Sequence, residues 1–585
     1  MDYSELVEVY EELNSTTKRL DKTNIIAEFL KKIKNEDVEH VMLLLEGRIF
    51  PNYDSREIGV AARIMLKAMS VATGNSAEEI EKKWKSLGDL GLVSEILIKN
   101  KKQFTLHSST LTVKKVFDNL RKLAELEGIG TVDRKIQLMA ELLTSAKSNE
   151  ARYIVKTILG EMRIGVGTGS MRDAIVWAFF GDKIGINYTK EGNEIEMENR
   201  ELYNEYSAIV RRAYDLTNEF AEVAVAAKKG KHSLEKISMK PGVPLNVMLA
   251  IKVDSVAEAF ETVGKPAAAE FKYDGFRIQA HKDEKGNVRL FTRKLEDVTN
   301  QFPDVVDAVK KNVKGRSFII DAEAVGYDKK TKKYLPFQSI SQRIRRKYDI
   351  ERMAGEFPVE LNVFDIICYN GKSLLDERFD ERRKLIEKII KKEPKKIMAS
   401  KSIISSDEDE IEQFFNEAFE AGNEGLMIKK LDAPYKPGAR VGYMVKYKKV
   451  METLDVVIIG AEWGEGKRSK WLSSYAIACM DEDGNFAEVG RVSTGLKEKR
   501  EEGLSFDEMT EILEPLIITD KGKEVLVKPK IVIEVAYEEI QQSTSYSSGY
   551  ALRFPRVIGL RIEKGVNDIS TLDYVKKLFD GQKKR

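Results

Sequence analysis

The sequence predicts a chain of several domains: a helical N-terminal part, a mixed α+β central part and a small β-barrel at the C-terminus. Three observations predict this order. Apolar residues repeat at helical spacing from residue 1 to about 235, strand and helix patterns mix from about 236 to 450, and short strands with glycine turns follow from about 451. A chain of 585 residues is also too long for one hydrophobic core, so roughly three or four domains are expected.

The N-terminal part is predicted to be helical because Leu6, Val9, Tyr10 and Leu13 recur at the spacing of one helix face. Strand patterns are sparse in this part. The segment Lys240-Pro241-Gly242-Val243-Pro244 cannot continue a helix, since it holds two prolines and a glycine. We therefore place the first domain boundary near residue 235.

The central part contains a predicted β-hairpin. Residues 276–280 alternate in polarity, 284–287 have the composition of a turn, and 288–290 alternate again. The C-terminal part has short strand patterns, among them 474–479 and 486–492, which favour a small barrel. A last helix is expected over 571–579 with Ser570 as its N-cap.

The composition is that of a globular protein, with 42% hydrophobic residues and a net charge of +2. Any affinity for nucleic acid must therefore come from local basic patches rather than from overall charge. The two cysteines do not support a disulfide framework, and no Cys/His spacing typical of zinc occurs. No signal peptide or long apolar span is visible, so we expect a cytoplasmic protein without membrane contact.

Lys272 lies in the motif Lys-x-Asp-Gly-x-Arg, which continues through Asp274 and Gly275 to Arg277. A lysine amine attacks phosphorus only when neutral, and burial or nearby cations favour the neutral form. Glycine permits close approach of the backbone to a ligand, and arginine binds phosphate oxygens with two donors. The motif therefore predicts a lysine nucleophile in a phosphate-transfer site.

This motif resembles the first signature of the covalent nucleotidyltransferases, which comprise ATP-dependent DNA ligases, RNA ligases and mRNA capping enzymes. Further fragments of the chain resemble the family's later signatures in the same order. They contain Arg293, Asp321-Ala322-Glu323, Phe364, Glu424-Gly425, Lys446 with Lys448, Arg553-Phe554-Pro555-Arg556 and Arg561-Ile562-Glu563-Lys564. The family usually has Asp in place of Glu563, so this residue is left out of the predicted site.

One N-terminal segment distinguishes the subfamilies. Residues 158–167 resemble a signature of the helical DNA-binding domain of archaeal and eukaryotic replicative ligases. Within this segment, Arg163 is predicted to contact DNA phosphate, and its glycines allow helix ends to approach DNA. Capping enzymes lack such a domain. The resemblance therefore favours an ATP-dependent DNA ligase of the archaeal/eukaryotic replicative type, with an RNA ligase or capping-type enzyme as the alternative.

The resemblance implies a helical DNA-binding domain over 1–235, an adenylation domain over 236–450 and an OB-fold domain with a terminal helix over 451–585. It also implies a three-step reaction. Lys272 takes AMP from ATP, the AMP passes to the 5′-phosphate of a nick in duplex DNA, and the 3′-hydroxyl displaces it. Such sealing serves replication, repair and recombination. ADP or NAD⁺ as the adenylate donor stays open.

The implied roles of the residues follow from their places in these signatures. Glu270 is expected at the adenine edge and Phe364 on the adenine face. Glu323 and Glu424 are the expected ligands of Mg²⁺. The remaining cations contact phosphate or ribose: Arg277, Arg293, Arg440, Lys446 and Lys448 at the nucleotide or nick, and Arg553, Arg556, Arg561 and Lys564 at the departing pyrophosphate.

The expected cofactors are ATP and Mg²⁺, and the expected partner is nicked double-stranded DNA. We expect a monomer that associates with the nucleoid. The resemblance also admits a sliding clamp as partner, for which Gln103 and Leu106 supply only part of the usual local pattern.

Overall fold

The computed structural model describes most of the chain. The described residues are 1–54, 56–100, 110–126, 128, 130–335, 340, 343–344, 348–448, 453–464, 468–520 and 522–583. Gln103, Leu106 and the predicted domain boundary at residue 450 lie outside them.

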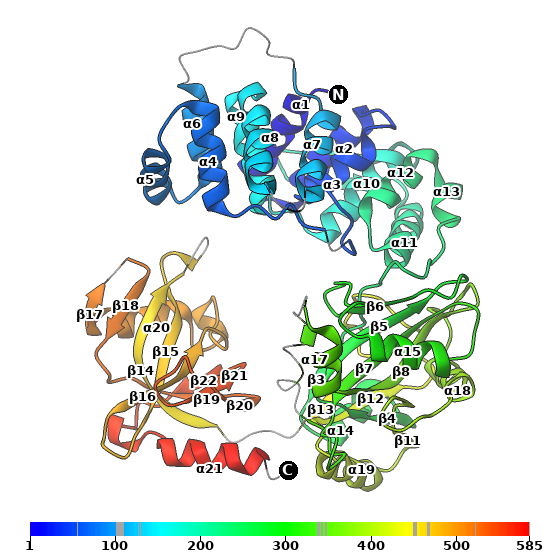
Figure 1. Ribbon diagram of the computed structural model, residues 1–585, viewed down its shortest axis with the longest axis vertical. Coiled ribbons are helices and arrows are strands. Elements are labelled where there is room, and N and C mark those ends of the chain that lie inside the picture. The colour runs from blue at the N-terminus through cyan, green and yellow to red at the C-terminus, as the bar shows by residue number, and fades with distance from the viewer. Residues whose placement is uncertain are drawn as a thin grey trace. The chain divides into compact units, whose positions relative to one another are not determined.

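The chain forms two compact units. The first comprises Met1–Ile251, Pro266–Ser402 and Lys429–Met444, and the second comprises Lys252–Lys265, Ile403–Ile428 and Val445–Arg585. The helical N-terminal region therefore belongs to the first unit and the strand-rich C-terminal region to the second (Figure 1).

The N-terminal region is built from helices that bury one apolar face each. The predicted repeat of Leu6, Val9, Tyr10 and Leu13 is buried in the first of them. The helices are α1 (Tyr3–Ser15), α2 (Arg19–Lys32), α3 (Val38–Leu45), α4 (Ala62–Thr73), α5 (Ala77–Leu87), α6 (Leu90–Lys99), α7 (Val113–Glu125), α8 (Thr131–Ser145), α9 (Ser148–Leu159), α10 (Thr168–Ile184), α11 (Arg200–Thr217), α12 (Phe220–Lys229) and α13 (Lys231–Glu235).

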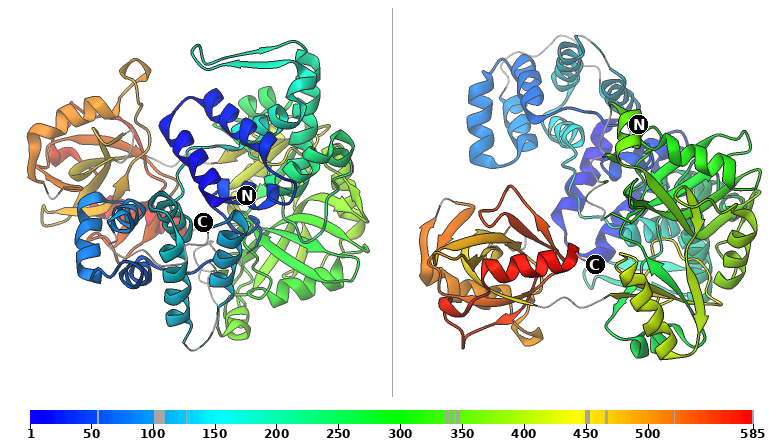
Figure 2. Two further views of the ribbon diagram at one scale, coloured as in Figure 1. Left: turned by 90° about the horizontal axis from the view of Figure 1, so that it is seen from above. Right: turned by 60° about the horizontal axis from the view of Figure 1, so that its bottom comes forward.

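A β-hairpin interrupts these helices and was not predicted. Strands β1 (Ile186–Thr189) and β2 (Glu194–Met197) pair antiparallel, with Tyr188 opposite Ile195. The hairpin projects from the helices (Figure 2, left). Its sequence signal is Gly192-Asn193, followed by an alternating strand. Asn193 adopts the left-handed backbone conformation that such turns require (φ 51°).

The central region mixes strands and helices. Its elements are β3 (Ile251–Val253), α14 (Val256–Val263), β4 (Ala267–Lys272), β5 (Phe276–Lys282), β6 (Val288–Thr292), α15 (Pro303–Asn312), β7 (Phe318–Gly326), α17 (Ile350–Glu356), β8 (Val359–Tyr369), β9 (Lys372–Ser373), α18 (Phe379–Ile389), β10 (Ile397–Ala399), β11 (Ser402–Ser405), α19 (Glu408–Glu420), β12 (Gly425–Lys430) and β13 (Met444–Lys448).

Two sheets organise this region. The first has the strand order β10-β8-β7-β5-β6, with β9 also paired to β8, and the second has the order β11-β4-β12-β13-β3. The predicted hairpin after Lys272 is confirmed, because β5 and β6 pair antiparallel with Ile278 opposite Thr292. Strands β7 and β8 are buried along most of their length, and α18 packs against β8. The first sheet is therefore held in place by apolar packing along β7 and β8.

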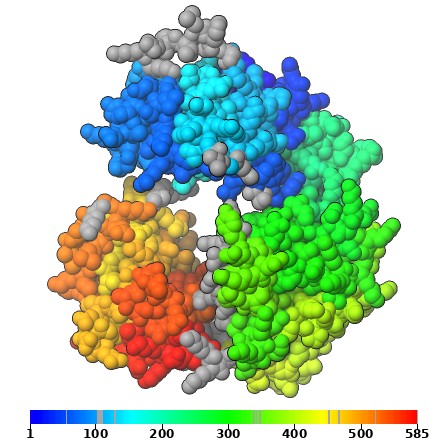
Figure 3. Space-filling view, in the orientation of Figure 1, coloured from blue at the N-terminus to red at the C-terminus, as the bar shows by residue number. Residues whose placement is uncertain are grey.

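The C-terminal region, coloured yellow to red in Figure 3, is rich in strands around its own apolar core. Its elements are β14 (Leu454–Trp463), β15 (Leu472–Met480), β16 (Phe486–Val492), α20 (Phe506–Leu513), β17 (Ile517–Asp520), β18 (Glu524–Val527), β19 (Val532–Ala536), β20 (Glu539–Gln542), β21 (Tyr550–Arg553), β22 (Arg556–Leu560) and α21 (Leu572–Lys583).

Strand β14 is the central strand of this region's sheet, since it pairs with β15, β18 and β19. The predicted last helix is present as α21, but Ser570 does not cap it. The Thr571 hydroxyl accepts from the backbone N–H of Tyr574 instead, and the Ser570 hydroxyl accepts from the backbone N–H of Asp455.

The predicted fold class is confirmed: a helical N-terminal region, an α+β central region and a strand-rich C-terminal region. Among the described residues, no helix combines the length and the apolar character needed to cross a bilayer.

Candidate active site

Strand β4 places Glu270 and Lys272 on one side of a sheet, because residues two apart in a strand point the same way. Glu270 is 1% exposed, whereas Lys272 is half-buried at the end of the strand. A buried carboxylate needs compensation for its lost hydration. Lys429 Nζ lies 2.5 Å from Glu270 Oε2, and Arg383 Nη1 lies 3.1 Å from Oε1. Two cations therefore fix the carboxylate next to the candidate nucleophile.

The turn after Lys272 lies directly against strand β7. A Cβ at Gly275 would lie 2.3 Å from the carbonyl oxygen of Ala324 and 3.0 Å from Cγ of Glu323, so only glycine fits there. Arg277 follows on β5 and is the register partner of Glu323 on β7. Directly opposite residues on antiparallel strands share a face of the sheet. The structure therefore brings Arg277 and Glu323 together beside the turn.

Phe364 lies close to two cations. Arg277 Cζ and Lys429 Nζ are each 5.0 Å from the centroid of its half-buried ring. Since Lys429 also binds Glu270, the contacts run without a break from Glu270 through Phe364 to Arg277. We call Glu270, Arg277, Glu323 and Phe364 the central cluster.

A buried ion pair holds the strand that carries Phe364. Arg382 donates from Nε and Nη2 to both carboxylate oxygens of Asp365, at 2.7 and 3.2 Å. Arg382 Nη1 also donates to the carbonyl of Ala433. Burial alone would raise the pKa of Asp365, but the Arg382 guanidinium lowers it below the ordinary value. Asp365 therefore stays charged and fixes the backbone next to Phe364.

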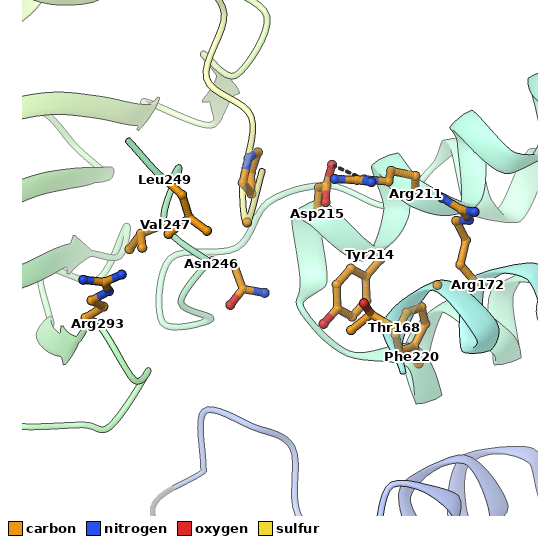
Figure 4. A pocket seen from close by; sticks show the side chains of 13 residues that line it. Thr168, Arg172, Arg211, Tyr214, Asp215, Phe220, Asn246, Val247, Leu249 and Arg293 are labelled. Carbon is orange, nitrogen blue, oxygen red and sulfur yellow. Dashed lines mark ion pairs between the residues drawn. The ribbon is translucent and has the colours of Figure 1, made fainter. Parts of the chain in front are cut away.

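Arg293 lies elsewhere in the first unit. It lines a cavity of about 410 Å³ with Arg172 and Arg211 of the helical region (Figure 4). Among the described residues, Asp215 is the only carboxylate that lines this cavity. It lies 3.8 Å from Arg211, and burial raises its pKa to about 6. The lining therefore carries more positive than negative charge. Arg440 is exposed on the segment between β12 and β13.

In the second unit, Glu424 and Lys448 are brought together. Lys448 Nζ lies 2.6 Å from Glu424 and 3.2 Å from Glu538, which sequence reasoning missed. Lys446 is two residues from Lys448 on β13 and shares its side of the strand. Glu424 thus already contacts a cation.

The four cations of the last two signature fragments, at residues 553–556 and 561–564, make separate contacts. Asp455 on β14 accepts from Arg561 Nε at 3.0 Å and from Lys564 Nζ at 2.6 Å. Burial would raise the pKa of Asp455, but these two cations lower it. Arg553 instead pairs with Glu539 at 3.0 Å, and Arg556 is exposed on β22. Arg561 and Lys564 therefore share a partner.

Arg163 is exposed in the loop between α9 and α10. Lys22 is buried and donates to the backbone carbonyls of Ile164 and Gly165, which fixes the loop. A Cβ at Gly165 would lie 2.7 Å from Lys22 Nζ, and this residue has a left-handed backbone (φ +64°). The left-handed backbone is what favours glycine here, since the lysine end near that Cβ belongs to a flexible side chain.

The supporting residues were missed because their partners are distant in sequence. Lys429 and Arg383 each lie more than a hundred positions from Glu270. Asp455 gave one weak signal: a carboxylate within the otherwise apolar run of residues 454–460. Across the ranges that the structure describes, no group of three or more His, Cys, Asp or Glu side chains is placed to hold a metal ion.

Comparison with known proteins covers nearly the whole chain. Family models match residues 2–176 ("DNA ligase N terminus"), 247–448 ("ATP dependent DNA ligase domain") and 468–564 ("ATP dependent DNA ligase C terminal region"). A protein named DNA ligase from Nanoarchaeum equitans is 46% identical over 100% of this chain and 99% of its own length. Another from Archaeoglobus fulgidus is 41% identical over 99% of this chain and 98% of its own.

A solved structure has a similar fold. The structure named "Pmar-Lig_Pre." aligns with a TM-score of 0.54 at 17% identity, covering 95% of this chain and 99% of that one. At this identity the likeness concerns the fold alone. The full-length relatives and the three family models together place this chain in the family of ATP-dependent DNA ligases.

Proposed function

We propose that this chain seals nicks in duplex DNA with ATP through a covalent AMP adduct on Lys272. The observation that carries this proposal is the position of Lys272. It ends strand β4 two residues after the doubly paired Glu270, and the turn that follows it lies against β7 beside Glu323. The chemistry needs a lysine, an adenine site and phosphate contacts; Lys272 is the lysine, and the central cluster supplies residues suited to the adenine and to phosphate. No finding favours the RNA ligase or capping alternative.

In the first step, Lys272 Nζ attacks the α-phosphate of ATP and pyrophosphate leaves. Glu270 is a hydrogen-bond acceptor suited to the adenine amino group, and Phe364 offers a flat apolar face to the base. Arg277 contributes a guanidinium suited to ribose or phosphate oxygens. Arg440, Lys446 and Lys448 are proposed to contact the triphosphate. Each displacement proceeds in line, so positioning and neutralisation of charge provide most of the rate.

In the later steps, AMP passes to the 5′-phosphate of the nick, and the 3′-hydroxyl then attacks that phosphate. Arg293 is proposed to hold a nick phosphate, which the excess of arginines around its cavity supports. Arg163 is proposed to contact DNA from its fixed loop in the helical region.

Mg²⁺ is proposed to bind at Glu323 and Glu424. Each of the two offers the carboxylate oxygen that Mg²⁺ prefers, and one or two protein carboxylates suffice besides water and phosphate. When bound, the ion neutralises the oxygens of the attacking and leaving groups.

We further propose domain boundaries near 235 and 450, and a monomer in the cytoplasm at the nucleoid. A sliding clamp is a further proposed partner, and replication, repair and recombination are the proposed settings.

The proposed function is tested by incubating the chain with α-labelled ATP or GTP and then denaturing it. We expect label from ATP, and not from GTP, to stay on the protein and to leave it when nicked duplex DNA is added, with a sealed product. A GMP adduct would favour the capping-type alternative. Sealing of nicked RNA but not of nicked DNA would favour an RNA ligase.

Deleting residues 1–235 should leave adenylation of Lys272 largely intact but weaken binding to nicked DNA. The first step needs only the nucleotide site and the terminal region, whereas holding a duplex needs many phosphate contacts, each of which makes affinity fall with salt. Binding and sealing are measured across a salt series. Equal affinity of the truncated and full chains at every salt concentration would remove the DNA-binding role from the helical region.

A further inference from the structure

Tyr435 lies in the segment between β12 and β13 and is 2% exposed. Its hydroxyl accepts a hydrogen bond from Arg277 Nη2 at 2.9 Å and one from the backbone N–H of Met248 at 3.3 Å. It donates to Oδ2 of Asp321 at 2.8 Å. A tyrosine hydroxyl has one donor and two acceptor positions, so these three bonds use its full capacity.

The same contacts hold the guanidinium of Arg277 at one of its nitrogens. Its Nη2 donates both to Tyr435 and to Oδ2 of Asp321, which is fully buried. Nε of Arg277 is buried without a hydrogen-bond partner among the described residues. The direction of the guanidinium therefore depends on the hydroxyl and carboxylate that share Nη2.

The network continues to the segment that precedes the central region. Gln279 Nε2 donates to Oδ1 of Asp321 at 3.2 Å, and its Oε1 accepts from the backbone N–H of Leu245 at 2.8 Å. His281 Nε2 lies 3.0 Å from the same Oε1, while its Nδ1 accepts from the backbone N–H of Gly242 at 2.9 Å.

The ring of His281 is neutral, with its proton on Nε2. Burial lowers its pKa to about 3, and its Nδ1 is occupied as an acceptor. Backbone groups at Gly242, Leu245 and Met248 are thereby tied to the residues around Arg277.

We propose that Tyr435 is a positioning residue for Arg277, which fixes the guanidinium for its contact with the nucleotide during adenylation of Lys272. This inference rests on the proposed role of Arg277. Without the hydroxyl, Asp321 becomes the sole partner of Nη2 among the residues that the structure describes, and the planar guanidinium can rotate toward a bidentate contact with that carboxylate. A displacement of about 1 Å at a positioning group can cost about 10²-fold in rate.

The hydroxyl can be removed without removing the ring. The Tyr435 ring packs within a buried region, where Arg382 Cζ lies 5.9 Å from its centroid. Tyr435→Phe keeps this packing and deletes only the hydrogen bonds. Tyr475→Phe is the matched control, because Tyr475 is equally buried and its hydroxyl donates to the carbonyl of Leu472 in the C-terminal region.

The test is a double-mutant cycle on the full-length chain, read as single-turnover adenylation of Lys272 over a range of ATP concentrations. We expect Tyr435→Phe to lower the maximal rate about 10- to 100-fold. The ATP concentration at half-maximal rate should change much less, since the loss concerns the transition state. In the Arg277→Lys background, which keeps the charge but not the fork, Tyr435→Phe should have little further effect. Tyr475→Phe should leave the rate unchanged.

Equal losses from Tyr435→Phe in both backgrounds would show a general structural role and overturn the inference, while leaving the proposed role of Arg277 intact. If Arg277→Lys alone did not slow adenylation, both the role of Arg277 and this inference would fail. Thermal unfolding of each variant is measured in parallel. Should Tyr435→Phe not fold, Asp321→Asn replaces it in the same cycle with the same expected non-additivity.

Discussion

Replacing Lys272 with alanine should abolish the covalent AMP adduct and the sealing of an ordinary nick. The amine nitrogen is the atom that forms the bond to phosphorus, and the central cluster contains no amine that could replace it. The nearby Lys429 is bound to Glu270, which also pairs with Arg383, and it lies close to Phe364. This ion pair keeps Lys429 from acting as the nucleophile. Loss of a nucleophile that acts as a unit with neighbouring catalytic residues commonly lowers the reaction rate by more than about 10⁴-fold. The adduct is measured with α-labelled ATP after denaturation.

The same variant should still seal, weakly, a nick that already carries the 5′-adenylate, because the last step uses no lysine–AMP bond. Lys282→Ala is the matched control. Lys282 ends strand β5 as Lys272 ends β4, is also half-buried, and donates to the carbonyl of Gly315. It should retain both activities. An adduct that still formed on the Lys272→Ala protein would show that another residue is the nucleophile.

The sequence predicted the fold class and the hairpin after Lys272 because these depend on local patterns. Alternation over 276–280 and 288–290 marks two strands, and the structure extends each by two residues, to 282 and 292. The β1–β2 hairpin was missed because its strands are only four residues long and lie among strong helical patterns. Its Gly192-Asn193 turn was the signal available.

The candidate site also contains residues that local sequence patterns predict and residues that they do not. Members of the central cluster lie in recognisable short motifs, so their positions were predictable, and the structure brings them together. Their partners belong to no motif. Arg383 reaches Glu270 from helix α18, and Tyr435 reaches Arg277 across 158 positions of sequence. Such pairings arise from the folding of distant segments against one sheet, and a single sequence carries no local signal of them.

Removing the charges of Arg561 and Lys564 together should slow adenylation of Lys272 by about 10²-fold or more, and slow the sealing of a pre-adenylated nick far less. Pyrophosphate leaves in line only when the β- and γ-phosphates are held opposite the attacking amine. Pyrophosphate is present in the first step alone, so residues that orient it cannot affect the later steps. Arg553 and Arg556 are proposed to assist, but they do not share the partner that gathers Arg561 and Lys564.

That partner, Asp455, makes the prediction specific. It lies 3.0 Å from Arg561 and 2.6 Å from Lys564, so one carboxylate holds both cations side by side in advance of any ligand. Lys577→Ala is the control: it removes a cation from an exposed pair with Asp573 at 2.9 Å on helix α21, and neither step should change. Both rates are measured by single-turnover assays with ATP and with the 5′-adenylated nick. Equal slowing of the two steps would mean that Arg561 and Lys564 bind DNA, because DNA, unlike pyrophosphate, is still required after the lysine has been adenylated.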